Sequence, residues 1–219
     1  MPYIKRNLEK IVQEVTLEYP VILLAGPRQV GKTTMLMKLM EGSERSYVTL
    51  DNLSERALAK SDPELFLQLH KPPILIDEVQ YAPELFTYIK IYVDQHHTPG
   101  SFWLTSSHIF KSLQGIHVSL AGRVAVFSMT SLTQAESCGE SVTPFTVGLE
   151  SLTERAKHRQ AADAHALFER IFKGSMPALL SGSVSNSQIF YSSYISTYIE
   201  RDVKDLSDSI DSLKFLRFI

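Results

Sequence analysis

The sequence has a single cysteine, Cys138, so no disulfide can form within the chain. This excludes the small disulfide-stapled folds and indicates a reducing compartment. The chain also lacks any run of about 18 apolar residues, so it contains no expected membrane span. Its N-terminal residues carry charges but no apolar core of the signal-peptide type. We therefore expect a cytoplasmic protein with no membrane partner.

An excess of one charge sign is missing too, because 22 basic and 24 acidic residues give a net charge of −2. No basic stripe stands out, so DNA is a possible but unsupported partner. The adjacent His96 and His97 have no partners at metal-ligand spacing and are interpreted as a solvated helix end. With 44% apolar residues, the 219-residue chain suits one medium-sized domain, or one domain and part of another.

Apolar patterns predict strands that alternate with helices as far as residue 127. An amphipathic helix over residues 4–18 opens the chain, and the continuous apolar run at 21–25 is typical of a strand buried on both faces. This alternation predicts an α/β fold with a mostly parallel sheet of about five strands and helices on both faces. Further strands are expected at 47–50, 73–77, 101–105 and 123–127, with helices at 33–40, from near 54, from near 62, at 83–95 and at 109–113.

The segment GPRQVGKT at residues 26–33 directly follows the first strand and has the Walker A spacing G-x-x-x-x-G-K-T. Glycines allow a tight turn in which backbone amides approach phosphate oxygens, beside the positive N-terminus of the next helix. We expect Lys32 to reach the β- and γ-phosphates and Thr33 to hold Mg²⁺. An ordinary strand-to-helix turn would not explain Lys32 and Thr33 together. The residues expected to bind the nucleotide are Gly26, Pro27, Arg28, Gln29, Val30, Gly31, Lys32, Thr33 and Thr34.

The segment ILIDE at residues 74–78 has the pattern of a Walker B motif. Asp77 ends an apolar strand, where its carboxylate can hold Mg²⁺ through a water. Glu78 follows and can act as the general base that orients or deprotonates the attacking water. An acidic strand end exposed to solvent is the alternative, but the upstream Walker A motif favours the catalytic interpretation.

Two further segments contain residues that could contact the nucleotide phosphates. WLTSS at 103–107 ends another strand, and the C-terminal ends of parallel strands converge on one crevice. There Thr105 or Ser106 can contact the γ-phosphate or the water, with Ser106 the better sensor, unless Ser106 or Ser107 only caps a helix. Arg123 precedes the last strand and can stabilise developing charge in a neighbouring subunit's site. The alternative for Arg123 is a surface arginine at a strand start.

Several segments occur in a familiar order over nearly the whole chain: GPRQVGKTT, YVTLDN, PILIDEVQ, WLTSS, SLAGRV, GSMPALL and YISTYIERDV. Together they resemble the prokaryotic AAA-type ATPases that carry a C-terminal domain of unknown function. The resemblance implies an AAA+ P-loop core with strand order 5-1-4-3-2, followed by a helical lid. It assigns the Walker, sensor and arginine-finger positions to Lys32, Thr33, Asp77, Glu78, Ser106 and Arg123.

The later part of the chain is less regular in sequence. The motif from Gly174 to Pro177 resembles a lid-side proline motif that contacts the base or sugar of the nucleotide. WLTSS lacks the glycine of the family's T-G-S-S form, and Arg201 is a weak candidate for a second sensor arginine. The apolar ending LKFLRFI, with no polar tail, predicts that the chain is a fragment without its C-terminal domain. The expected parts are a nucleotide-binding core over 1–135, a linker or irregular loop over 136–160, and a helical lid over 161–219.

These residues predict a Mg²⁺-dependent ATPase that couples its nucleotide state to an unidentified protein partner or to a C-terminal domain, with a homo-oligomer as one arrangement that we consider. No guanine-reading N-K-x-D element occurs, which favours ATP over GTP. One alternative is a slow nucleotide-dependent switch with little hydrolysis. Another is a small-molecule kinase, which is disfavoured because residues 128–160 contain few arginines.

Overall fold

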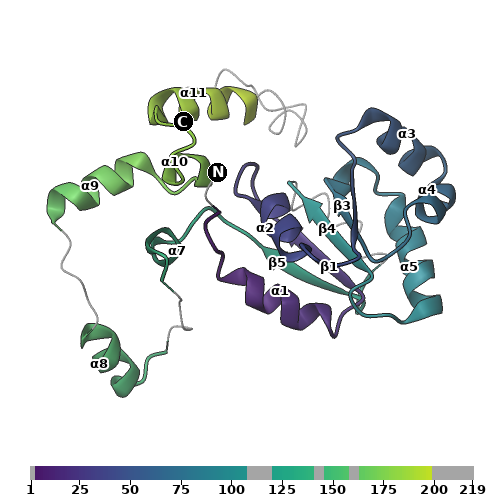
Figure 1. The fold of residues 1–219 in the computed structure, drawn as a ribbon, viewed down its shortest axis with the longest axis horizontal. Helices are drawn as coiled ribbons and strands as arrows, with labels where there is room; N and C mark the ends of the chain where they lie inside the picture. The colour runs from purple at the N-terminus through teal and green to yellow at the C-terminus, as the bar shows by residue number, and fades with distance from the viewer. Residues whose placement is uncertain (1–2, 108–119, 141–145, 158–162, 199–219) are drawn as a thin grey trace. The chain divides into compact units, whose positions relative to one another are not determined.

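The computed structural model describes residues 3–107, 120–140, 146–157 and 163–198. The chain divides into two compact units, one formed by residues 5–132 and the other by residues 1–4 with residues 133–219 (Figure 1). The helix expected at 109–113 and the sensor candidate Arg201 lie outside the described residues. No helix in the described part of the chain is both long and apolar enough to cross a membrane.

The first unit is built on a five-stranded sheet in which every neighbouring pair of strands is parallel. Its strand order is β2-β3-β4-β1-β5, which confirms the expected order 5-1-4-3-2 read from the opposite edge. Ala25 pairs with both Ser106 and Ser128, so the C-terminal ends of β1, β4 and β5 lie side by side. The strands are β1 Val21–Ala25, β2 Ser46–Thr49, β3 Ile74–Asp77, β4 Phe102–Ser106 and β5 Val124–Ser128.

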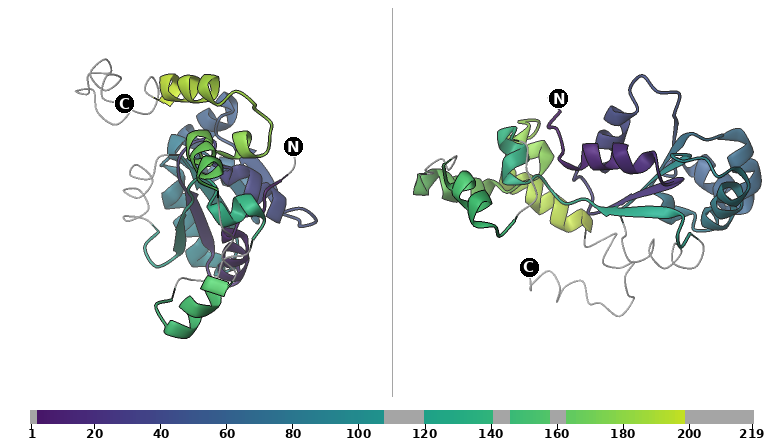
Figure 2. Two further views of the ribbon diagram at one scale, coloured as in Figure 1. Left: turned by 90° about the vertical axis from the view of Figure 1, so that its left-hand side faces the viewer. Right: turned by 90° about the horizontal axis from the view of Figure 1, so that it is seen from below.

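Helices cover both faces of this sheet (Figures 1 and 2). The alternation of side chains along β1 sends Val21 and Leu23 into a core shared with α3, α4 and α5, and Ile22 and Leu24 into a core shared with α1 and α2. All five β1 residues are buried, as the apolar run predicts for a strand covered on two sides. The helical elements are α1 Leu8–Thr16, α2 Lys32–Leu39, α3 Leu53–Ser61, α4 Pro63–Leu69, the 3₁₀ turn η1 Val79–Tyr81 and α5 Leu85–His96.

Within residues 136–160 the structure differs from the expected linker or irregular loop, because two helices lie in or across this stretch. The first is α7, whose start is fixed by a capping box in which the Thr133 hydroxyl accepts from the Glu136 N–H and the Glu136 carboxylate accepts from the Thr133 N–H. Gly139 ends it in a left-handed conformation. The helices of the second unit are α7 Gln134–Cys138, α8 Leu149–Lys157, α9 Ala164–Lys173, α10 Pro177–Leu180 and α11 Ser187–Tyr198.

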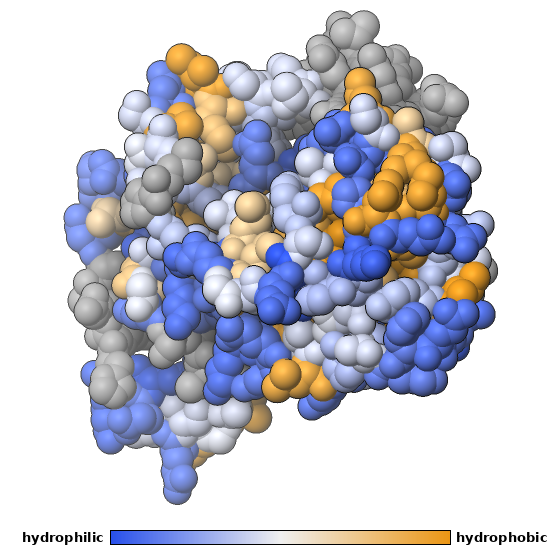
Figure 3. Space-filling model, turned by 45° about the vertical axis from the view of Figure 1, so that its right-hand side comes forward, coloured by the Kyte–Doolittle hydropathy of each residue, from blue (hydrophilic) through white to orange (hydrophobic). Residues whose placement is uncertain are grey.

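The face seen in Figure 3 is mainly hydrophilic, with separate apolar patches among the coloured residues. In the first unit, the exposed apolar side chains include Leu53 and Leu69. In the second unit, α9 exposes Phe168 and Phe172. Exposed apolar side chains of this kind carry no functional assignment by themselves.

Candidate functional site

The loop between β1 and α2 has a backbone that few residues can adopt. Gly26 has a φ of 154°, Gln29 of 63° and Gly31 of 94°. A Cβ atom on Gly26 would lie 2.0 Å from the Met129 carbonyl oxygen, so only glycine fits there. The loop is also tied to β4, because the Gly26 N–H donates to the Ser106 carbonyl at 3.1 Å. This turn therefore sits between the C-terminal ends of β4 and β5.

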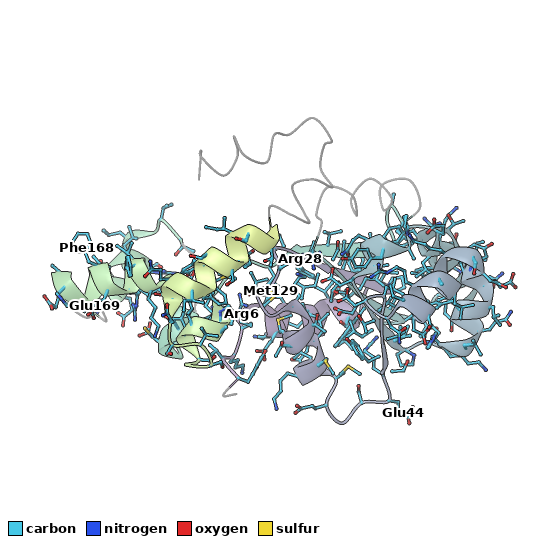
Figure 4. The ribbon with its side chains drawn as sticks, turned by 90° about the horizontal axis from the view of Figure 1, so that it is seen from above. Arg6, Arg28, Glu44, Met129, Phe168 and Glu169 are labelled. Atoms are coloured by element: carbon cyan, nitrogen blue, oxygen red, sulfur yellow. The ribbon has the colours of Figure 1, made fainter. Side chains whose placement is uncertain are left out.

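Arg6 holds this loop from behind, a role that the sequence analysis did not identify. Its buried guanidinium donates to the Val30 carbonyl in the loop and to the Thr130 carbonyl after β5, both at 2.8 Å. Arg6 and Met129 are labelled in Figure 4, near the loop. Hydrogen bonds from a charged donor are stronger than neutral ones, so Arg6 is a firm link between the loop and the end of β5.

Lys32 is the first residue of α2 and folds its side chain back into the loop. Its Nζ donates to the carbonyls of Gly26 at 2.8 Å and Pro27 at 2.9 Å. Only 5% of Lys32 is exposed. A buried ammonium and the N-terminus of α2 thus create positive potential at the same point, as a phosphate group requires.

Asp77, the last residue of β3, brings the two Walker motifs together. Its Oδ1 accepts hydrogen bonds from the Thr33 and Thr105 hydroxyls, each at 2.5 Å. Its Oδ2 has two longer contacts, with Thr49 at 3.4 Å and Tyr47 at 3.5 Å. Burial, together with the charge and hydrogen bond of Asp77, raises the pKa of Tyr47, which keeps the phenol protonated as a donor. The carboxylate is therefore held by hydroxyls from two strands, β2 and β4, and from α2.

Glu78 has a left-handed backbone, with φ 57° and ψ 47°. This conformation costs a non-glycine residue roughly 1–2 kcal/mol, and such strain clusters at functional sites. Its Oε2 accepts a hydrogen bond from Ser107 Oγ at 2.8 Å and another from Gln80 Nε2. Its N–H donates to Thr105 Oγ1 at 3.0 Å, so the Thr105 hydroxyl bridges both acidic residues.

The surroundings of Glu78 favour its ionised form. Burial alone raises the pKa of its carboxyl group, but the hydrogen bonds from Gln80 and Ser107 oppose burial. The positive charges of Lys32 and Arg28 act in the same direction as these hydrogen bonds. The net result is a pKa below the ordinary glutamate value, so Glu78 carries a carboxylate at neutral pH that can accept a proton.

The other candidates of the WLTSS segment and the loop lie close to this cluster. Ser106 is fully buried at the end of β4, and its carbonyl accepts the Gly26 N–H. Its neighbours Thr105 and Ser107 are the residues whose hydroxyls contact Asp77 and Glu78. Arg28 Nη2 donates to the Tyr81 hydroxyl at 3.2 Å, which links the loop to η1. The sensor role of Ser106 stays a prediction.

Arg123 lies elsewhere in the unit. It directly precedes β5. Because Val124 pairs with Val21 at the start of β1, Arg123 lies at the N-terminal ends of the strands, whereas the loop lies at their C-terminal ends. Its guanidinium pairs with Asp94 of α5 at 2.5 Å, and both side chains are about one-third exposed or more. The hydrogen bond lowers the pKa of Asp94 and raises that of Arg123. The structure therefore does not bring Arg123 to the Walker cluster of its own chain, by which we mean Lys32, Thr33, Asp77 and Glu78.

The lid motif falls in the second unit. Pro177 is the first residue of α10, a position where its missing N–H costs nothing. Gly174 has a φ of 73°, and a Cβ there would lie 2.0 Å from the Tyr191 hydroxyl oxygen. These features explain the residue types in G-x-x-P by backbone geometry. A contact of this motif with a nucleotide stays a prediction.

Comparisons with known proteins place the fold in context. Residues 18–138 match the model of a family described as an AAA domain, and residues 164–219 match a domain of unknown function, DUF8612. Uncharacterised proteins of Mycobacterium tuberculosis and Mycobacterium bovis are each 30% identical over 198 residues, or 90% of this chain. The chain spans only 39% of the length of these two relatives.

Two solved structures share the fold. The Walker-type ATPase of Pyrococcus abyssi aligns with a TM-score of 0.55 and 14% identity, covering 93% of this chain and 75% of that one. DnaA from Aquifex aeolicus, bound to AMPPCP, aligns with a TM-score of 0.50 and 12% identity, covering 90% of this chain and 63% of that one. The family model covers more than half of the chain. The chain therefore belongs to the AAA domain family and has its P-loop ATPase fold.

Proposed function

We propose that this chain binds ATP with Mg²⁺ and hydrolyses it at the cluster around Asp77. The observation that carries the proposal is the hydrogen bond from the Thr33 hydroxyl to Asp77 Oδ1, at 2.5 Å. It joins the residue after the Walker A lysine to the Walker B aspartate, which lie 44 positions apart in the sequence. Neither an incidental glycine turn nor a solvated acidic strand end requires that contact.

ATP binding is assigned to the loop and the start of α2. The loop amides and the N-terminus of α2 face the phosphates and offer donors that cost no reorganisation. Lys32 is already buried within the loop, so its ammonium exchanges the carbonyls of Gly26 and Pro27 for phosphate oxygens over a short distance. Of the residues expected to contact nucleotide, Thr34 is exposed on α2 and contributes mainly through its backbone.

The residues around Asp77 suit Mg²⁺. Thr33 donates its hydroxyl proton to Asp77, which leaves the lone pairs of Thr33 Oγ1 for a cation. The described residues contain no group of three or more His, Cys, Asp or Glu side chains able to hold a metal. This agrees with Mg²⁺, which is usually held by one or two protein oxygens together with substrate phosphates. When bound, the ion would neutralise charge on the β- and γ-phosphates.

Hydrolysis is assigned to Glu78 with Thr105 and Ser107 as supports. Glu78 accepts a proton from water as the water oxygen bonds to the γ-phosphorus, and the bond from that phosphorus to the bridging oxygen breaks. The products are ADP and inorganic phosphate, and Glu78 later returns the proton to solvent. Because phosphoryl transfer depends mainly on positioning and electrostatics, the held carboxylate and the buried Lys32 are the principal contributions of this chain.

A phosphate-release assay tests this assignment. We expect Glu78→Gln to lower turnover about 100-fold or more, the scale of a lost general base, while nucleotide affinity is retained. Glu41→Gln is the matched control, because the Glu41 side chain is 64% exposed and pairs only with Lys38 among the described residues. Turnover that is indifferent to Glu78→Gln would refute the proposed base. Tight ATP binding by the wild type with almost no release would instead support the slow nucleotide-dependent switch.

A further inference from the structure

Gln80 makes side-chain contacts to which the proposed hydrolysis assigns no role. Its Nε2 donates to Glu78 Oε2 and lies 3.0 Å from Ser107 Oγ, which itself donates to the same Glu78 oxygen at 2.8 Å. Both side-chain hydrogen bonds of the carboxylate therefore fall on Oε2. Within the described part of the chain, Glu78 Oε1 accepts none. One oxygen of the carboxylate is anchored and the other is left to react.

The opposite end of the Gln80 amide is unusual. Its Oε1 is buried and has no hydrogen-bond partner among the described residues. Turning the amide over would not help, because it would place that oxygen against the Glu78 carboxylate oxygen. A buried acceptor without a partner lowers the stability of the folded chain. A glutamine kept for stability alone would not be expected at this position.

The backbone makes the anchor rigid. Glu78 and Gln80 belong to one tight turn, because η1 spans Val79–Tyr81 and the Tyr81 N–H donates back to the Glu78 carbonyl at 3.1 Å. Ser107 directly follows β4, whereas Glu78 directly follows β3. The amide thus spans two elements and fixes the Glu78 side chain relative to both.

We propose that Gln80 is a positioning residue that anchors Glu78 Oε2, so that Oε1 is the oxygen presented to the attacking water. This inference rests on the proposed hydrolysis and deepens it. Gln80 touches neither the water nor the phosphate in this role and acts only through Glu78. Its contribution is the orientation of the base, a factor in which small displacements have large effects on rate.

The test compares the wild-type chain with Gln80→Met and Gln80→Glu, which keep the length of the side chain and remove the donor. We expect Gln80→Met to lower kcat roughly 10- to 100-fold, with KM and the affinity for a fluorescent ATP analogue within about twofold. Its melting temperature should stay equal or rise, because the unpartnered acceptor is gone. Gln80→Glu should lose as much kcat or more and serves if Gln80→Met does not fold. Gln13→Met, on the exposed face of α1, is the matched control.

A double-mutant cycle separates the possible outcomes. If Gln80 acts through Glu78, adding Gln80→Met to Glu78→Gln should cause no further loss in a single-turnover assay with excess protein. An equal further loss would overturn the inference, as would unchanged kcat in Gln80→Met or a lower melting temperature with loss of nucleotide binding. Absence of turnover in the wild type would overturn the proposed hydrolysis, and the inference with it. Unchanged kcat in both Gln80 variants alone, with Glu78→Gln inactive, would overturn only the inference.

Discussion

At the scale of single residues, the site depends on hydroxyl groups as much as on charges. Thr105 is fully buried, donates to Asp77 and accepts from the backbone N–H of Glu78. A carboxylate that is buried needs donors, because desolvation of an unsatisfied charge is expensive. Thr105 therefore supports the orientation of Asp77 and the strained backbone of Glu78 with a single oxygen atom.

We expect Thr105→Val, which keeps the shape of the side chain, to reduce the free energy of unfolding by about 1–3 kcal/mol. The reason is that both Asp77 and the Glu78 N–H lose a partner inside the protein. Urea titration followed by circular dichroism measures the change. The control is Thr98→Val, whose exposed hydroxyl donates to the His96 carbonyl and should matter by less than about 0.5 kcal/mol. Equal losses in the two variants would contradict the structural role given to Thr105.

At the scale of elements, the two ends of one parallel sheet carry different chemistry. The C-terminal ends of the strands carry the Walker residues, since Ala25, Asp77 and Ser106 each end a strand. The N-terminal ends lie beside the C-terminal part of α5, where Asp94 pairs with Arg123. This separation follows from parallel topology alone, because all strands have their N-terminal ends on one side of the sheet and their C-terminal ends on the other.

The Asp94–Arg123 pair gives a pH-dependent contribution to stability. Its hydrogen bond lowers the pKa of Asp94 in the folded chain, so the contribution is present above the ordinary aspartate pKa of about 3.9 and is lost as the pH falls through the lower folded value. We expect Asp94→Asn to unfold at a lower urea concentration than the wild type at pH 7. The difference should narrow below about pH 4.

The difference in stability between Asp94→Asn and the wild type should be small, because exposed ion pairs contribute little. Arg123→Ala should produce a similar difference at pH 7, and the double variant should lose no more than either single variant. If the difference in stability between Asp94→Asn and the wild type stays constant from pH 7 to pH 3, the ionised Asp94 carboxylate is not the stabilising group of this pair.

The sequence predicted the sheet and the places of the β1–α2 loop and Asp77 in it well, because each depends on local pattern. The run VILLA is β1 without any change of boundary, and Asp77 ends β3 as its position after an apolar run indicates. Gln80 was not identified, since its contact with Glu78 depends on the left-handed backbone of Glu78 and on the folding back of η1. No periodicity in the sequence reports such a turn.

The N-terminal segment and the stretch after β5 show a second limit. The helix expected over 4–18 begins only at Leu8, because the Arg6 N–H bonds the Glu9 carboxylate and the Arg6 guanidinium bonds loop carbonyls. Arginine on an amphipathic pattern is normally read as a solvated residue, so its burial was not foreseen. The T-x-x-E sequence at 133–136 is a recognisable capping-box signal, and weighing it would have found α7.

At the scale of the whole molecule, the position of Arg123 bears on how copies of the chain could work together. Arg123 lies away from the Walker residues of its own chain, and to reach the site of a neighbouring copy it would exchange its pair with Asp94 for a contact in that site. A contact of that kind joins two different surfaces of the same protein, so it is head-to-tail rather than two-fold symmetric. We propose a neighbouring copy as the recipient of Arg123, in line with the arginine-finger position that the family resemblance implies.

Mixing two inactive variants tests this arrangement. Lys32→Ala removes the nucleotide-binding ammonium, and Arg123→Ala leaves the Walker residues intact. We expect each variant alone to have at least tenfold lower turnover. A mixture should regain part of the activity, because a Lys32→Ala chain still offers Arg123 to the intact site of its neighbour. Wild-type turnover in Arg123→Ala, or a mixture no more active than its components, would contradict a role in a neighbouring site.

The close approach of Gly26 to the Met129 carbonyl has a mechanical consequence. There is no room for even a methyl group between the two backbones, and the Met129 N–H donates to the Ala25 carbonyl at 2.7 Å. The loop that follows β1 and the segment that follows β5 are thus tightly packed against each other. A displacement of one of these two segments would therefore displace the other, and Met129 shortly precedes Leu132, where the first compact unit ends.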